Sequence, residues 1–450
     1  MIHPLLVGAL LFSLCQDQDP KVAGLLKGRA KGKPLDATEL NEVAKKIRPE
    51  IEQLRGETFQ REVVLEVLDE AGFAARTRER VAARMTPEER SAEGTVAQLL
   101  GLIPVSMDWE STATAALERR SNGFYDLRTD HLYLRAGQSP GTSRVLLARG
   151  LGQALDDQVF DLVGLAAREV GNADERFALE ALMEGSSMSV MRAWAMQSIG
   201  AVMPEDMQDA TTQGLKELED APPFLWKREY ATGLLGAAFL LRLEDFRKAG
   251  DKPLKGADAS AAFRDPPRSS EQILHPQKYW DPSTRDDPVP VRFEIGELPA
   301  GWTVVSEDTL GEFGWGLVVQ PKDARSGLNA KTLGRVKFTF KSSAGWGGDR
   351  ILLLGRGEAR VLHCQTLWDT PEDAAEFAAA IATLEESLRG AASGFAAEKG
   401  LAAGDAGVEI VRRDEKGLAL VVWAGVGVEE RTRIRAAIHP TVVLPPQEQR

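Results

Sequence analysis

Apolar residues recur at helical spacing between residues 35 and 120, on faces that otherwise carry Glu, Lys and Arg. Asp36 and Thr38 are candidate caps of the first helix. The segment Thr-Pro-Glu-Glu at residues 86–89 is typical of a helix start, because proline fits the first turn and acidic side chains favour its positive end. The pattern predicts an all-helical N-terminal region.

The pattern changes after residue 121. Between Gly123 and Arg135 apolar residues alternate around Arg128-Thr129-Asp130, which predicts a short hairpin. A helix is expected next, with apolar positions four residues apart that should form one buried stripe. The stripe comprises Leu147, Leu151, Leu155 and Val159. Residues 121–270 are therefore predicted to form a mainly helical core with one hairpin.

Strand and helix patterns are mixed beyond a proline-rich connector at residues 265–287. Strands are predicted at Val291–Ile295, at Trp302–Ser306, on both sides of Gly355-Arg356-Gly357 within Arg350–Thr366, at Val408–Arg412 and at Leu418–Ala424. Helices are predicted at Pro371–Leu388 and Glu429–Ile438, a tight turn at Gly345–Gly348, and a frayed tail from Pro440. The predicted fold class is multidomain α+β, in which a smaller α+β domain follows the mainly helical core.

A chain of 450 residues is long enough for roughly two to four domains. The expected divisions are a signal peptide at 1–15, a helical N-terminal region at 16–120, the core at 121–270, a linker at 271–287, a C-terminal α+β domain at 288–440 and a tail at 441–450.

The apolar run Leu5–Leu14 has the length of the core of an export signal and is too short to cross a bilayer. Cleavage before Gln16 would give an extracytoplasmic protein, secreted or periplasmic, without a transmembrane segment in the mature chain. Lipidation of Cys15 and a buried N-terminal helix are the alternatives. After cleavage Cys364 has no disulfide partner, and its apolar neighbours predict a buried structural thiol.

The net charge of −12 and the absence of a basic stripe argue against a nucleic-acid or anionic-membrane partner. The five histidines are scattered, and no two stand three or four residues apart as zinc ligands on a helix do. We therefore expect no metal and no other cofactor. Acidic residues near the predicted stripe helix lack the spacing of a calcium loop and are expected to be solvated or to cap helix ends. They are Asp156, Asp157, Asp161, Glu180 and Glu184.

The segment Arg149–Asp161 reads R-G-L-G-Q-A-L-D-D-Q-V-F-D. It resembles the active-site helix H-E-L-T-H-A-L-Q-D-Q-h-F-D, with h variable, of exported bacterial zinc peptidases of the gluzincin type. In such a helix two His bind zinc and the Glu between them activates water. This chain has Arg149, Gly150 and Gln153 at those three positions, and none of them can perform those roles. The resemblance implies a zincin-like core without its metal chemistry.

Further segments carry the resemblance along more than half of the chain. The family's third zinc ligand is a Glu in A-L-x-E-G, and Ala181–Gly185 fits with Glu184 at that position. Tyr230 resembles the Tyr of a P-Y-x-x-G helix start, although Glu229 replaces the proline. The other similar segments are Ser269–Tyr279, Ala344–Arg350 and Trp368-Asp369-Thr370.

If the fold resembles that of the family, Arg149 should approach Glu184, and one organic cation would replace the divalent ion. The alternative is that Arg149 reaches solvent while Glu184 bonds locally. Gly150 and Gly152 weaken a helix, so they indicate either a locally unstable turn or the close approach of another element.

The predicted function is that of an exported, non-catalytic pseudo-metallopeptidase that binds a peptide or protein in its vestigial cleft. The vestigial site is predicted to comprise Arg149, Gly150, Gln153, Glu184 and Tyr230. One alternative is a hydrolase with a non-standard site, in which Glu180 and Glu184 share a proton. Another is a structural cell-envelope protein that uses its C-terminal domain.

Overall fold

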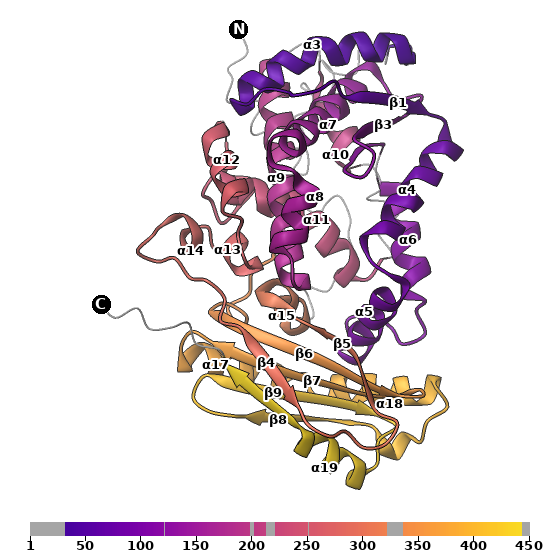
Figure 1. Ribbon diagram of the computed structural model, residues 1–450, viewed down its shortest axis with the longest axis vertical. Coiled ribbons are helices and arrows are strands. Elements are labelled where there is room, and N and C mark those ends of the chain that lie inside the picture. Colours follow the sequence, from indigo (N-terminus) through magenta and orange to yellow (C-terminus); the bar gives the residue numbers. More distant parts are fainter. Residues whose placement is uncertain are drawn as a thin grey trace, which may run out of the picture.

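The computed structural model describes residues 32–120, 122–198, 202–212, 221–250, 252–321 and 336–442. These residues form an α+β protein, with a mainly helical portion that extends to α14 at residue 280 and a sheet portion that begins at β4 at residue 291 (Figure 1). No helix among them is long and apolar enough to cross a membrane. The predicted leader at 1–15, Cys15 and most of the predicted tail lie outside the described residues.

The N-terminal region consists of four helices and one strand within the described residues. They are α3 (Ala37–Arg55), β1 (Val64–Leu68), α4 (Glu70–Arg84), α5 (Pro87–Leu99) and α6 (Trp109–Arg120). Asp36 and Thr86 cap α3 and α5 through reciprocal capping boxes, as the sequence predicts, whereas Thr38, the other candidate cap, lies inside α3. The prediction of an all-helical region is wrong at β1. This short run rich in Val and Leu is stabilised by parallel pairing with a strand distant in sequence, which local periodicity does not reveal.

The predicted hairpin is confirmed as β2 (Gly123–Asp126) and β3 (His131–Arg135), and β1 completes a sheet in the order β1-β3-β2. The helices that follow are α7 (Pro140–Phe160), α8 (Leu162–Glu169), α9 (Ala173–Gln197), α10 (Pro204–Thr212) and α11 (Pro223–Leu240). The predicted stripe on α7 packs into the core, where Leu147, Leu151 and Leu155 are buried and Val159 is partly buried.

The segment predicted as a linker is folded and packed, so its description as a simple connector is wrong. Residues 246–280 form a 3₁₀ turn η2 (Phe246–Lys248) and the helices α12 (Gly256–Arg264), α13 (Ser270–Leu274) and α14 (Gln277–Trp280). Every residue of α13 is buried. Proline-rich composition predicted a connector here, and the burial of these helices depends on contacts with distant parts of the chain.

The sheet portion contains five antiparallel strands in the order β5-β6-β7-β9-β8. Its elements are β4 (Val291–Ile295), β5 (Thr303–Asp308), α15 (Gly311–Val319), β6 (Trp346–Arg356), β7 (Ala359–Trp368), α17 (Pro371–Ala382), α18 (Glu385–Glu398), the 3₁₀ turn η4 (Ala403–Asp405), β8 (Gly407–Arg412), β9 (Gly417–Ala424), α19 (Val428–Ala437) and β10 (Ile438–Val442). All the predicted strands are present.

Three local predictions in this portion need correction. The helix predicted at 371–388 is divided into α17 and α18 at Thr383-Leu384. The turn predicted at 345–348 lies mostly inside β6, where a bulge at Gly347 follows the positive φ of Gly345. The start of the tail is a strand, β10, because it pairs with β4.

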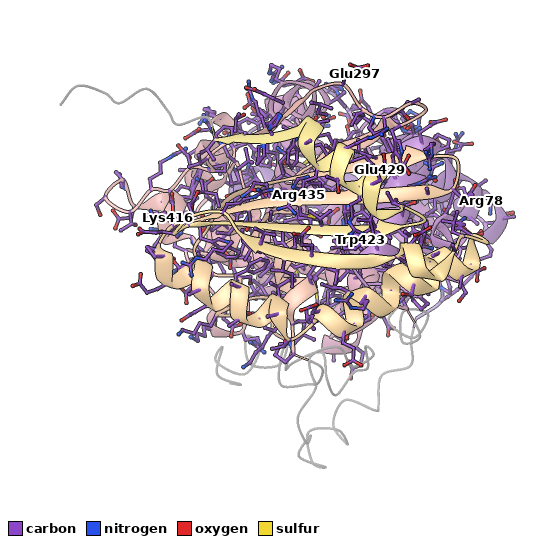
Figure 2. The ribbon with its side chains drawn as sticks, turned by 90° about the horizontal axis from the view of Figure 1, so that it is seen from below. Arg78, Glu297, Lys416, Trp423, Glu429 and Arg435 are labelled. Carbon is purple, nitrogen blue, oxygen red and sulfur yellow. The ribbon has the colours of Figure 1, made fainter. Side chains whose placement is uncertain are left out.

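Both faces of the sheet are covered. One face packs against α15, α17 and α18, and its core includes Cys364, the predicted buried thiol, with Trp315, Trp346 and Trp368. The other face packs against β4, β10 and α19, and Figure 2 shows α19, with Glu429 and Arg435, crossing this side. These three tryptophans are buried.

Candidate functional site

A cavity of about 530 Å³ lies in the helical portion, walled by α4, β2, α7, α8, α9 and α11. Its lining includes all the residues predicted for the vestigial site, namely Arg149, Gly150, Gln153, Glu184 and Tyr230. Residues that are distant in sequence therefore meet at one concave surface. Cavities of this size hold small molecules or short peptide segments.

Arg149 and Glu184 form an ion pair across the cavity wall, from α7 to α9. Gln153, one turn after Arg149, donates from Nε2 to the other carboxylate oxygen of Glu184 at 3.2 Å. Both oxygens of Glu184 thus accept hydrogen bonds from Arg149 and Gln153, the two positions that the resemblance assigns to histidine. Of the two arrangements considered for Arg149, the paired one is present.

The close approach of Leu132 explains why residue 150 is a glycine. A Cβ at this position would lie 2.2 Å from Cδ1 of Leu132, a buried residue of β3, whereas α7 runs without interruption from Pro140 to Phe160. Gly152 is less constrained, because a Cβ there would meet Val190 at an ordinary 3.4 Å. Any side chain at position 150 would therefore require the Leu132 side chain to shift.

Gly185, which follows Glu184, also has a structural role. A Cβ on Gly185 would lie 2.1 Å from the backbone of Gly236, so α9 and α11 cross where only glycine fits. This crossing sets the distance between the helices that carry Glu184 and Tyr230.

Glu180, one turn before Glu184, has its own cationic partner. Arg84 of α4 donates to it at 2.7 Å and lies 3.9 Å from Glu229. Burial alone would raise the pKa of Glu180, but Arg84 and Arg228 outweigh it and lower the pKa below its ordinary value. This geometry argues against the alternative in which Glu180 and Glu184 share a proton, because each carboxylate forms an ion pair with an arginine of its own.

The described lining of the cavity contains neither His nor Cys. Its carboxylates are Asp126, Glu180, Glu184 and Glu229, and each has an arginine within 4.0 Å. A zinc site needs three donor side chains free to face one ion. Of the three positions that the resemblance assigns to zinc ligands, only Glu184 carries a ligand side chain, and its oxygens are already bonded, so these residues do not fit a zinc ion.

The acidic residues at the end of α7 connect elements. The expectation that they are solvated or cap helix ends is wrong for Asp156, whereas Asp157 accepts from the backbone N–H of Leu162 at the start of α8 at 3.2 Å. Asp156 is buried and accepts from Nε and Nη2 of Arg55 on α3 at 2.8 and 2.6 Å. Asp157 accepts from the hydroxyl of Tyr125 at 2.9 Å. Asp161 is the residue that both ends α7 and caps α8, as expected of a helix-end carboxylate.

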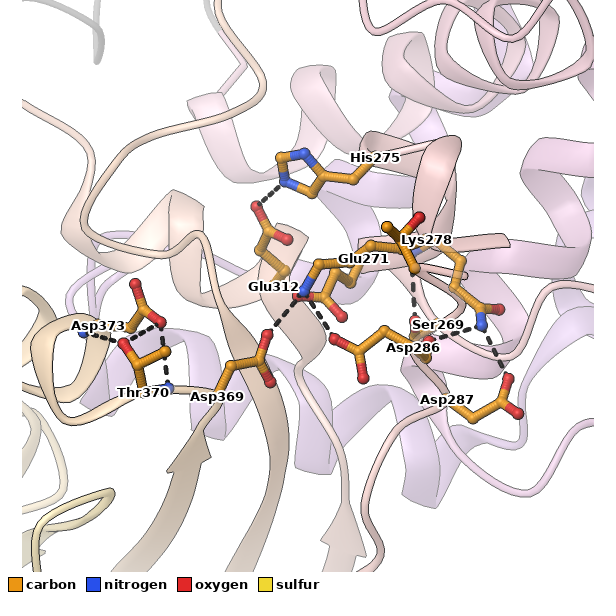
Figure 3. Close-up of polar contacts among 12 residues, drawn as sticks. Ser269, Glu271, His275, Lys278, Asp286, Asp287, Glu312, Asp369, Thr370 and Asp373 are labelled. Carbon is orange, nitrogen blue, oxygen red and sulfur yellow. Dashed lines mark hydrogen bonds and ion pairs between the residues drawn. The ribbon is translucent and has the colours of Figure 1, made fainter. Parts of the chain in front are cut away.

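The segments Ser269–Tyr279 and Trp368-Asp369-Thr370 meet at a second place, the seam between the helical and sheet portions (Figure 3). Nζ of Lys278 lies 2.7, 2.8 and 2.7 Å from carboxylate oxygens of Glu271, Asp286 and Asp369. His275 bonds to Glu312 of α15 at 3.0 Å. A lysine ammonium therefore occupies the centre of the acidic group, and this cluster joins α13 and α14 to the end of β7.

Asp174, at the start of α9, belongs to the same seam, and its pKa lies well above that of an ordinary aspartate. It is buried and accepts from the backbone N–H of Ser270 at 3.1 Å. Burial raises the pKa of Asp174 from 3.8 to about 8, and the nearby Asp349 adds to the shift. The folded protein therefore keeps a proton that the unfolded chain releases near pH 4.

We expect this group to make the protein less stable as pH rises. Its contribution is fully present below pH 3.8 and is lost as pH rises through about 8, with a slope of at most about 1.4 kcal/mol per pH unit. Asp174→Asn mimics the protonated form and should flatten this part of the profile. Urea unfolding at pH 5 and pH 8 measures it, and equal slopes for the variant and the native chain would contradict the assignment.

The match found in comparisons with known proteins covers only the sheet portion. A domain of unknown function (DUF8575) matches residues 301–435. No curated protein and no solved structure matches the chain. The matched segment runs from just before β5 through most of α19, and every residue that lines the large cavity lies outside it.

Proposed function

We propose that this protein is a non-catalytic pseudo-metallopeptidase that binds a peptide or protein segment in the large cavity. The observation that carries the proposal is the convergence of Arg149, Gln153 and Glu184 on the cavity wall. Their arrangement has the form expected of a zinc triad, but the side chains at the two histidine positions hold the glutamate themselves. Nothing at this position can activate water.

The proposal that the core is zincin-like is supported by its local order. A hairpin precedes α7, α7 carries the altered motif, and α9 brings Glu184 against it. The glycines at 150, 185 and 236 maintain close contacts around these residues. Such packing preserves the cavity although the metal chemistry is absent. Export is part of the proposal and is supported by the apolar run at Leu5–Leu14.

Blocking the cavity tests the proposal. Val163 lies at the rim, is 50% exposed, and lines the cavity, so Val163→Trp should obstruct it without disturbing the core. We expect the full chain to bind members of a fluorescent library of short peptides without cleaving them, with or without a chelator. Val163→Trp should weaken this binding at least about tenfold, since it removes most of the accessible contact area.

Val428→Trp is the matched control, because Val428 is 69% exposed on α19 in the sheet portion. This variant should bind like the native chain. Cleavage of the peptides that a chelator abolishes would contradict the non-catalytic assignment. Equal binding by the Val163→Trp variant would show that the ligand does not enter the cavity.

A further inference from the structure

Arg80 of α4 lines the same cavity and differs from Arg84 and Arg149, which both pair with carboxylates. Among the described residues, its guanidinium has no hydrogen bond and no ion pair, and its one close partner is the ring of Phe124, with Cζ 4.9 Å from the ring centroid. Burial lowers the pKa of Arg80, and the charges of Arg84 and Arg149 lower it further. Its guanidinium therefore has unused donors that face the cavity.

The charges of the residues that line the cavity also favour an anionic ligand. Five arginines and four carboxylates line the cavity, an excess of one positive charge, whereas the whole chain carries −12. The carboxylates are engaged by Arg84, Arg128 and Arg149. Glu184 and Asp126 attract Arg80 but do not contact it. An anionic group entering the cavity would meet Arg80 without having to break an existing pair.

The walls near these charges are apolar. Leu127, Met183 and Met188 line the cavity and are partly exposed to it. Unbranched, polarisable Met side chains adapt to ligands of varied shape. The cavity therefore presents a cation next to an adaptable apolar surface, which suits a ligand with an anionic end and an apolar body.

We propose that the cavity recognises a carboxylate on an apolar body, and specifically the free C-terminal carboxylate of a peptide that ends in apolar residues. Arg80 binds the carboxylate in bidentate fashion, because a planar guanidinium matches the geometry of the two oxygens. The apolar side chains of the ligand lie on Leu127, Met183 and Met188. This inference rests on the proposed function, since it assumes that the cavity is the binding site.

Calorimetric titration of the full chain tests it with three probes: acetyl-Ala-Leu-Phe as the free acid, the same peptide as its C-terminal amide, and decanoate. The acid should bind at least about tenfold more tightly than the amide, because the amide cannot accept two charge-assisted bonds from Arg80. Arg80→Met should abolish this preference. Arg78→Met is the control, because Arg78 is exposed on the same helix and lies at the edge of the molecule in Figure 2.

The possible outcomes separate the two proposals. Equal binding of acid and amide would overturn carboxylate recognition and leave peptide binding in place. Binding of decanoate alone, lost in Arg80→Met, would support carboxylate recognition and overturn peptide binding. No binding by any probe would overturn the inference. If Arg80→Met does not fold, Arg80→Lys replaces it, and an unchanged preference for the acid in that variant would also overturn the inference.

Discussion

Replacing Arg149 and Gln153 together by histidine is expected to create a zinc site that the native chain lacks. The two positions are one helical turn apart on α7, and both side chains already reach the carboxylate of Glu184. Two His and one Glu in this arrangement are a complete set of protein ligands for zinc. Affinity should rise by roughly a hundredfold or more, since the change supplies two of the three ligands.

Zinc titration of the double variant measures this gain. Arg149→His alone should gain much less, and adding Glu184→Gln to the double variant should remove most of the gain. Gly150 stays unchanged in these variants, because any side chain there meets Leu132. We therefore expect metal binding without peptidase activity. A double variant that binds zinc no better than the native chain would mean that residues 149, 153 and 184 do not form the proposed triad.

Replacing Lys278 by methionine is expected to lower the free energy of unfolding by about 3–5 kcal/mol. The ammonium group bonds to three carboxylates, and the side chain is only 20% exposed. Without it, Glu271, Asp286 and Asp369 would face one another at the seam, with oxygens within 4.8 Å. Methionine has a similar length, so the loss would come from the charge and not from a cavity.

Chemical denaturation at neutral pH measures the effect of Lys278→Met. Lys45→Met is the matched control, because Lys45 pairs with Glu42 at 2.8 Å but is 68% exposed, and such surface pairs contribute about 0–1 kcal/mol. Equal effects of the two substitutions would contradict the assignment of Lys278 as the residue that joins the two portions.

Local patterns were sufficient for much of the fold. The capping residues Asp36 and Thr86, the buried stripe of α7 and the strands of the C-terminal sheet were all predicted from spacing and residue type. Strand β1 was missed because its stability comes from parallel pairing with β3, about sixty residues later. The segment 271–287 was mistaken for a linker because its contacts are with distant elements.

The candidate site was predictable where a sequence motif carried it. The altered motif on α7 and the Glu of α9 indicated which residues would meet, and the ion pair of Arg149 with Glu184 is present. Arg80 gave no such signal, because its unpaired state depends on which carboxylates the fold assigns to its neighbours. The Lys278 cluster was also missed, although the segment that carries it was singled out, since a seam between two portions has no local pattern.

We propose that the guanidinium of Arg149 holds Glu184 at the place where the zinc peptidases that the sequence resembles would hold a metal ion. Elemental analysis of the full-length protein, purified without chelators and then equilibrated with zinc, tests this claim most directly. We predict far less than one zinc per chain, with Glu184 still bonded to Arg149. One tightly held zinc per chain, located beside α7 by anomalous scattering, would contradict it.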